Sequence, residues 1–220
     1  MNSTSHTAGN RGLNSVVTRF FGNVARAYDT AALQRAVYLP PQDQVIAELR
    51  AARSRRIADI GCGTGILTAR IARELKPEVV YGVDASTGML AQGRARSAAV
   101  HWRNAAAEKL PLGAGELDAI VSTSAFHFFD HPVALREFAR VLVPGGLVAI
   151  ATMHPSAPTV RPIQRLTRSP RFPAHAPSPR ETRKLLSDAG FEVVDQRKVS
   201  RPVPEWLIPD VITVGRLRAE

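Results

Sequence analysis

The 220-residue sequence contains very little cysteine, and Cys62 is its only one. A single cysteine excludes an internal disulfide and a cysteine-based zinc site. No apolar run reaches the roughly 20 residues that a membrane-spanning helix needs. The polar residues 1–12 lack the apolar stretch of a signal peptide, so we interpret them as a flexible leader. We therefore expect a cytoplasmic protein with no membrane span.

Acidic residues are also scarce. The chain has 19 Asp and Glu against 29 Lys and Arg, which leaves a formal net charge of +10. This excess is typical of proteins that meet nucleic acid, an acidic carrier protein or another anionic partner. Base composition is the alternative explanation, because arginine outnumbers lysine, alanine is abundant and the basic residues are spread along the chain. The charge therefore supports an anionic partner without choosing one, and nucleic acid is not the expected one.

Apolar periodicity predicts an α/β protein. Residues 13–28 place apolar side chains at helical spacing, and Pro40 with Pro41 begins a second helix. Short apolar runs then predict strands over residues 56–60, 79–83, 100–103, 118–122, 147–151, 191–198 and 211–216, of which the last two could form a hairpin. Between them helices are expected over 66–75, 86–96, 132–142 and 178–190. This alternation predicts a doubly wound, mostly parallel seven-stranded sheet with helices on both faces, a Rossmann-like fold.

Capping residues mark the expected helix ends. Ser86 begins one helix, either Asp130 or His131 begins another, and Ser178 with Glu181 forms a capping box. A Pro-Gly-Gly segment at residues 144–146 is expected to separate a helix from the next strand.

A single domain is expected over residues 13–220. Within it we expect cap helices over residues 13–54 and an irregular segment over residues 152–177, which is rich in proline and arginine. A loop of that length in a compact domain is usually functional, and we place it on the acceptor side of the site.

A glycine-rich turn follows the first predicted strand. Gly61, Gly63 and Gly65 stand between this strand and its helix, and Asp84 closes the second strand. Such a turn lets a nucleoside-type ligand approach the backbone closely, and the acid can accept hydrogen bonds from both ribose hydroxyls. The pattern predicts a nucleoside-binding site at the carboxyl edge of the sheet.

The residues around this turn distinguish between ligands. Dinucleotide binding requires a third small residue at the sixth place of the turn, where this chain has Ile66. Asp59, just before the turn, would repel a pyrophosphate but suits a ligand that carries an ammonium and no phosphate. These residues favour S-adenosylmethionine over a nicotinamide dinucleotide.

Four segments, in order, carry a family resemblance: IADIGCGTG (57–65), GVDASTGMLAQGRARS (82–97), AAAEKLPL (105–112) and residues 117–146. They are similar to the motifs of class I S-adenosylmethionine-dependent methyltransferases, and the resemblance extends over roughly residues 20–198. It implies a Rossmann-like methyltransferase whose product is S-adenosylhomocysteine. Because the leaving group of methyl transfer is neutral, we expect no metal. The cofactor-binding residues that it implies are Tyr28, Asp59, Gly61, Cys62, Gly63, Asp84, Ala85, Met89, Ala106, Ala107, Glu108 and Ser122. Ala106 departs from the family, which usually has a polar side chain there for the adenine amino group.

Methyl transfer to a protonated acceptor needs a general base, and His127 is the candidate because it follows the fourth strand at the ligand-binding edge. A role as pocket lining is the alternative. Tyr28 resembles the aromatic that closes over the methionine end of the cofactor, and it could equally be a core aromatic. His154 and His175 lie in the irregular segment and could face the acceptor or solvent. Cys62 is expected to be a small packing residue.

Three functions remain open for the acceptor. The first is O- or C-methylation of a small molecule. The second is methylation of a substrate on an acidic acyl carrier protein, because residues 20–35 resemble the N-terminus of malonyl-acyl-carrier-protein methyltransferases. The third is a scaffold that binds the cofactor or RNA without catalysis. Residues 121–126, VSTSAF, lack the tetrapeptide of enzymes that methylate planar amides.

Overall fold

The computed structural model describes residues 38–153, 176–201 and 208–219. Its elements, in chain order, are α3 (Leu39–Ala51), β1 (Arg56–Ile60), α4 (Ile66–Leu75), β2 (Val79–Asp84), α5 (Thr87–Arg96), β3 (His101–Asn104), β4 (Leu117–Thr123), η2 (Phe126–Phe128), α6 (His131–Val141), β5 (Leu142–Met153), α8 (Pro179–Asp188), β6 (Phe191–Lys198) and β7 (Asp210–Leu217). The predicted leader, the helix expected over 13–28 and most of the segment 152–177 lie outside the described residues.

One seven-stranded sheet runs through the molecule in the order β3-β2-β1-β4-β5-β7-β6. Neighbouring strands from β3 to β5 are parallel, whereas β7 is antiparallel to both β5 and β6. The sheet is therefore mixed, and the predicted seven-stranded α/β architecture is confirmed. In the parallel part, all carboxyl ends meet at one edge, here called the carboxyl edge, and the opposite side is the amino edge.

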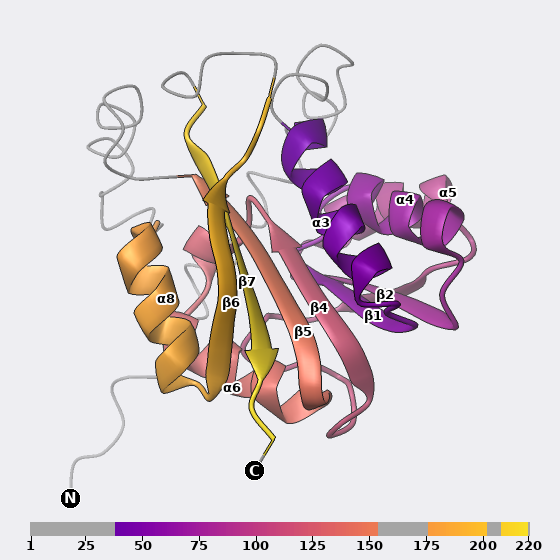
Figure 1. The fold of residues 1–220 in the computed structure, drawn as a ribbon. Coiled ribbons are helices and arrows are strands. Elements are labelled where there is room, and N and C mark those ends of the chain that lie inside the picture. The colour runs from indigo at the N-terminus through magenta and orange to yellow at the C-terminus, as the bar shows by residue number, and fades with distance from the viewer. Residues whose placement is uncertain (1–37, 154–175, 202–207, 220) are drawn as a thin grey trace, which may run out of the picture.

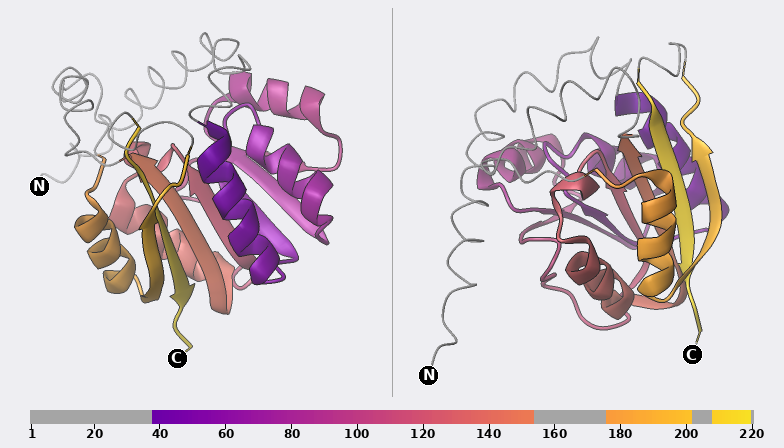
Figure 2. Two further views of the ribbon diagram at one scale, coloured as in Figure 1. Left: turned by 45° about the horizontal axis from the view of Figure 1, so that its top comes forward. Right: turned by 90° about the vertical axis from the view of Figure 1, so that its left-hand side faces the viewer.

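Helices cover both faces of this sheet (Figures 1 and 2). Helices α3, α4 and α5 lie on one face, and α6 and α8 lie on the other. Strand residues alternate between the two cores: in β1, Ile57 packs under α3 and α4, while Ala58 and Ile60 pack on the opposite side. Strands buried on both faces explain why the short apolar runs were visible in the sequence.

Side-chain caps place the helix starts where the sequence predicts them. The Ser86 hydroxyl accepts a hydrogen bond from the Met89 amide at the start of α5, and Asp130 caps α6 in the same way. At α8, the Ser178 and Glu181 side chains form the expected reciprocal capping box. These local interactions fix where the chain leaves the sheet and returns to it.

The start of β5 corrects one sequence prediction. We expected the Pro-Gly-Gly segment to separate α6 from a strand beginning at Leu147, but β5 begins at Leu142. Leu142 pairs with Leu117, and the register then shifts so that Leu147 pairs with Ala119. Because α6 delivers the chain directly alongside the start of β4, pairing begins before the breakers and the additional residues form a bulge.

In the part of the chain that the structure describes, no helix combines the length and apolar character required to cross a bilayer.

Candidate cofactor site at the carboxyl edge

The glycine turn is attached to the end of β2 by backbone hydrogen bonds. The Gly61 and Cys62 amides both donate to the Val83 carbonyl oxygen, at 2.8 and 3.0 Å, and the Gly65 amide closes the turn onto the Cys62 carbonyl at 3.0 Å. Because β1 lies between β2 and β4 in the sheet, this turn stands beside the ends of both neighbouring strands. The glycine turn and the ends of β2 and β4, which the sequence analysis associated with the cofactor, therefore meet at one edge.

Asp84, the last residue of β2, is held at this edge by two backbone hydrogen bonds. One carboxylate oxygen accepts the Gly63 amide at 2.8 Å, and the other accepts the Ser86 amide at 2.8 Å. Burial raises the pKa of Asp84, against the effect of these two hydrogen bonds. The side chain is only partly buried. Each oxygen retains a further lone pair, so the carboxylate can accept additional hydrogen bonds from a ligand without releasing the turn.

Gly61 and Gly63 serve different purposes although both are left-handed, with φ of +72° and +55°. A Cβ on Gly61 would lie 2.4 Å from the Ala125 Cβ and 3.2 Å from the Phe129 ring. A Cβ on Gly63 would meet nothing within 4 Å. Gly61 therefore lets the segment after β4 close against the turn, whereas the space beside Gly63 is open, as a ligand site requires.

Trp102, on β3, packs against Gly65, the last residue of the glycine turn. A Cβ on Gly65, Gly82 or Gly93 would lie within 2.7 Å of the Trp102 indole ring. The indole fills the space that the three glycines leave, and its Nε1 donates to the Ser97 carbonyl at 3.0 Å. Sequence analysis did not single out Trp102. Its only signal in the sequence was the presence of three glycines in three consecutive elements. That these glycines meet at one tryptophan can be recognised only from the fold.

Asp59 is a buried carboxylate beneath the turn, with 1% of its surface exposed. The Thr68 hydroxyl of α4 donates to it at 2.6 Å. Burial raises the pKa of Asp59 from 3.8 to about 7; the Thr68 hydrogen bond opposes this shift and nearby Asp84 adds to it. Thr68 was missed by the sequence analysis, because a threonine inside a helix carries no signal of its partner.

Cys62 lies in the glycine turn, close to both aspartates, and Ser122 lies near the end of β4. Burial raises the pKa of the Cys62 thiol well above its usual value, so the thiol stays protonated, and the side chain packs against the core under α3 and α4. Ser122 is fully buried, and its hydroxyl oxygen has no hydrogen-bond partner in the described residues. Cys62 is thus partly buried against the core, and Ser122 leaves an unsatisfied polar atom near the end of β4.

The expected adenine side follows β2 and β3. Ala85 is exposed, Met89 is buried, and Ala106 and Ala107 lie in the loop after β3. One carboxylate oxygen of Glu108 accepts the Asp130 amide at 2.7 Å, at the start of α6.

His127 lies in η2, immediately after β4, as its position in the sequence implies. Its ring is 4.0 Å from the Phe128 ring, between centroids. Burial, with a smaller contribution from nearby His131, lowers the pKa of His127 to about 4. The imidazole is therefore neutral at pH 7, which a base requires, but it is a weak base.

Three predicted side chains fall outside the described residues: Tyr28, His154 and His175. Among the residues that the structure does describe, no group of three or more His, Cys, Asp or Glu side chains could hold a metal ion. The residues brought together at the carboxyl edge are thus the glycine turn, the two aspartates, the loop after β3 and His127.

Comparison with known protein families agrees with this geometry. Residues 58–150 match the model of a family described as "Methyltransferase domain". The malonyl-[acyl-carrier protein] O-methyltransferase of Dechloromonas aromatica is 32% identical over 196 residues, which are 87% of this chain and 71% of that protein. The biotin biosynthesis bifunctional protein BioHC of Cellvibrio japonicus is 37% identical over 142 residues, 63% of this chain and 27% of that protein. The chain therefore corresponds to only about a quarter of this second relative.

Solved structures show the same fold. An S-adenosylmethionine-dependent methyltransferase from Thermotoga maritima is 25% identical, with a TM-score of 0.70 over 93% of this chain and 99% of that chain. The magnesium protoporphyrin IX methyltransferase of Synechocystis PCC 6803, solved with S-adenosylhomocysteine, has a TM-score of 0.72 at 17% identity, over 94% and 100% of the two chains. The second likeness concerns the fold alone.

Proposed function

The chain belongs to the class I S-adenosylmethionine-dependent methyltransferases, and on that premise we propose that it transfers a methyl group from S-adenosylmethionine to a small acceptor. One observation carries the proposal: the Asp84 carboxylate is fixed beside the open face of Gly63, at the carboxyl edge of the sheet. This arrangement fits a ribose, whose two hydroxyls can share the remaining lone pairs of the carboxylate.

The described residues fit the rest of the cofactor as well. A nearby cationic ligand would lower the pKa of the buried Asp59, which burial raises to about 7, and would so favour its ionised form, whereas a phosphate would raise that pKa further. Alongside Asp84 and Gly63, we propose contacts from the following residues: Asp59, Gly61, Cys62, Ala85, Met89, Ala106, Ala107, Glu108 and Ser122. Tyr28 is proposed to close over the methionine end. The bound cofactor supplies an electrophilic methyl carbon on a sulfonium, and the protein supplies alignment and exclusion of water.

The low basicity of His127 restricts the classes of acceptor that the site can methylate. A base whose pKa is about 4 provides little driving force for removing a proton from a phenol, whose pKa is about 10. An acceptor that is already ionised at pH 7 needs no base. We therefore propose O-methylation of a carboxylate: its oxygen forms a bond to the methyl carbon, the carbon–sulfur bond breaks, and the products are a methyl ester and S-adenosylhomocysteine. His127 then lines the acceptor side of the site as a neutral ring.

A carboxylate carried on an acidic acyl carrier protein is the second candidate acceptor. The Dechloromonas aromatica relative is a malonyl-[acyl-carrier protein] O-methyltransferase, and a net charge of +10 would attract an acidic carrier. Carrier docking by surface charge predicts that the rate falls steeply as salt rises, whereas a free small acceptor predicts weak salt dependence. We further propose a cytoplasmic location, which fits the absence of any possible internal disulfide.

The test is turnover. S-adenosylhomocysteine production is measured for free dicarboxylates and monocarboxylates, for their thioesters on an acyl carrier protein, and for phenols as a comparison. We expect product with carboxylates, its loss in Asp84→Ala, and little change in His127→Phe. Product with phenols alone, abolished in His127→Phe, would contradict the carboxylate proposal. Cofactor binding without product across the whole panel would favour a non-catalytic scaffold.

A further inference from the structure

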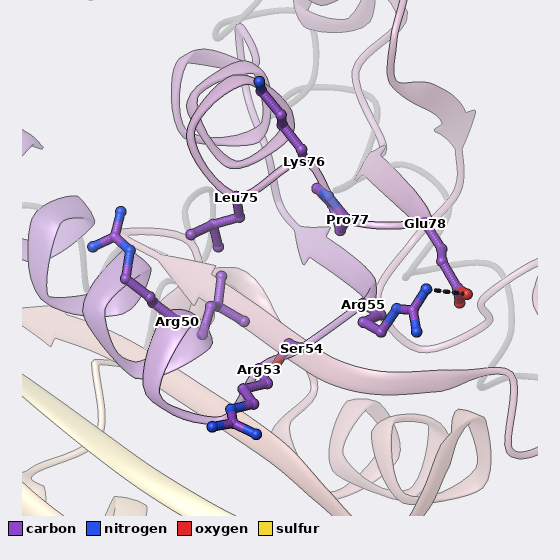
Figure 3. Close-up of a pocket in the computed structure, with 9 residues that line it drawn as sticks. Arg50, Arg53, Ser54, Arg55, Leu75, Lys76, Pro77 and Glu78 are labelled. Carbon is purple, nitrogen blue, oxygen red and sulfur yellow. Dashed lines mark ion pairs between the residues drawn. The ribbon is translucent and has the colours of Figure 1, made fainter.

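A hollow lies at the amino edge of the sheet, away from the glycine turn (Figure 3). It has a volume of about 410 Å³ and lies between the C-terminal ends of α3 and α4 and the segments leading into β1 and β2. Its apolar lining comes from Leu49, Leu75 and Pro77, and Ser54 adds a hydroxyl. We call this hollow the basic basin because of the charged residues around it. A volume in the range of roughly 300–1,000 Å³ is typical of small-molecule sites.

Cations surround the basin. Figure 3 shows Arg50, Arg53 and Lys76 arranged around Leu75. The lining also includes one ion pair, in which Arg55 contacts Glu78 at 2.7 Å. Arg50, Arg53 and Lys76 form no ion pair with other described residues, so the basin carries a net positive charge without a partner in this part of the chain.

Two helix C-termini at the basin account for some of this charge but not for all of it. A cation in the last turn of a helix is stabilised by the partial negative charge of the free carbonyls. Arg50 fills this role in α3, and Lys76 is the C-cap of α4. Arg53 follows after the end of α3 and is a surplus cation in a hollow that faces solvent.

The backbone at the basin is also unusual. Arg53 and Lys76 have left-handed φ of +53° and +47°, and in the described residues Ser124 is the only other non-glycine with a positive φ. Glycine or asparagine adopts this conformation at lower cost, and helix ends commonly use glycine there. The chain thus places cations at positions where glycine would be easier to accommodate. Strained residues concentrate at functional sites, and Ser124 lies at the end of β4, next to the cofactor site.

We propose that the basic basin binds a small phosphate-bearing anion of the nucleotide class. Guanidinium groups form bidentate hydrogen bonds with phosphates, and a lysine adds a compact charge. The apolar lining of Leu49, Leu75 and Pro77 suits a ring that a phosphate alone would not fill. The hollow is concave and small, so it suits a small ligand better than it suits the surface of an acidic protein. β1 is five residues long, so the basin and the glycine turn are on the order of 15 Å apart, and a ligand here is separate from the cofactor.

The probes are ADP and inorganic pyrophosphate, titrated by calorimetry into the full chain saturated with S-adenosylhomocysteine, so that ADP cannot occupy the cofactor site. We expect one ADP site, weaker binding of pyrophosphate because the apolar lining stays unused, and a decline of both with salt. The main variant, Arg53→Gly with Lys76→Gly, removes two charges while easing the left-handed backbone, so it should fold at least as well as the native chain. It should weaken ADP binding by at least roughly tenfold.

The matched control removes two exposed cations elsewhere, Arg136→Gln on α6 with Arg180→Gln on α8. It should leave ADP binding within about twofold, because these cations face another side of the molecule. Equal losses in both variants would overturn the proposal, since general surface charge would explain them. Absence of ADP binding in the native chain would also overturn it. The same conclusion follows if a short single-stranded RNA binds at the basin while ADP and pyrophosphate do not.

Discussion

The two edges of the sheet carry charges of opposite sign, and these charges differ in burial and in the partners they have. At the carboxyl edge, Asp59 and Asp84 are buried or half-buried, and each accepts hydrogen bonds from the protein. At the amino edge, Arg50, Arg53 and Lys76 are exposed and lack ion pairs within the described chain. A buried carboxylate needs hydrogen-bond partners, so its role can be inferred from the residues that contact it. An exposed cation is hydrated and needs no such partners, so its role must be inferred from the shape of the surface around it and from the strain of its backbone.

Each edge also contains an aspartate whose carboxylate accepts two backbone amides. Asp84 accepts the Gly63 and Ser86 amides, while Asp118, at the start of β4, accepts the Arg55 and Arg56 amides at 3.0–3.1 Å. Two amides bind each carboxylate, yet only Asp84 stands beside an open, left-handed glycine. A hydrogen-bonded aspartate is therefore not evidence of a ligand site by itself; the space next to it decides.

The largest expected effect separates these two aspartates. Asp84→Ala removes an acceptor for two ribose hydroxyls, each charge-assisted bond being about 1.5–3 kcal/mol, so S-adenosylhomocysteine should bind at least roughly 100-fold more weakly. Asp118→Ala should cost about 1–3 kcal/mol of stability and leave the affinity nearly unchanged. Calorimetric titration and thermal unfolding measure both quantities. Equal affinity losses in the two variants would mean that Asp84 acts through folding alone.

Within the turn, Gly61→Ala and Gly63→Ala should separate packing from binding. Alanine at Gly61 collides with Ala125 in a left-handed backbone, so we expect a loss of about 2–4 kcal/mol in the free energy of unfolding. Alanine at Gly63 meets open space and should cost only about 1–2 kcal/mol, from its left-handed φ. Its affinity for S-adenosylhomocysteine should fall, because the methyl group occupies ligand space. The comparison fails if Gly63→Ala binds as the native chain does.

Asp59→Asn should change how stability depends on pH. The pKa of Asp59 is about 7 in the folded state, above its ordinary value of 3.8, so the folded state binds the proton more tightly and the native chain loses stability as pH rises from about 4 to 7. The asparagine can still accept the Thr68 hydrogen bond, has no charge to bury, and should flatten this slope. At pH 8 it should be more stable than the native chain by about 1–3 kcal/mol. Parallel stability curves from pH 4 to 8 would show that Asp59 does not titrate in this range.

The smallest effect concerns the amino edge. Arg53→Gly with Lys76→Gly relieves two left-handed non-glycine residues, and the free energy of unfolding should rise by about 0.5–1 kcal/mol. Thermal unfolding should therefore show a melting temperature about 1–4 °C higher. The control pair, Arg136→Gln with Arg180→Gln, should not raise it. A fall in the melting temperature would mean that these cations stabilise the helix ends more than their backbone strains them.

The sequence predicted most of the fold because its signals are local. The bounds of β1, α4 and β6 match the expectation, and the caps at Ser86 and Ser178 are where they were expected. The start of β5 was wrong, because Leu142 pairs with a strand that the local Pro-Gly-Gly signal cannot sense. Tertiary pairing overrode a strong local breaker there.

The site residues also differ in whether local sequence could identify them. Asp84 and the glycine turn follow one another closely enough to be recognised as a motif. The partners that shape the site come from distant segments: Thr68 beneath Asp59, Phe129 behind Gly61 and the Asp130 amide at Glu108. The basic basin joins two helix ends, so neither Arg53 nor Lys76 could be assigned a role from the sequence.

Thermal unfolding of the native chain with and without S-adenosylhomocysteine tests the central claim most directly. Ligand at about 100 times its dissociation constant stabilises the folded state by about 2.7 kcal/mol. For a chain of this length, that corresponds to a rise of roughly 5–10 °C in the melting temperature. We predict this rise in the native chain and in Asp118→Ala, and its loss in Asp84→Ala. The absence of a rise in the native chain at saturating ligand would contradict the assignment of the carboxyl edge as the cofactor site.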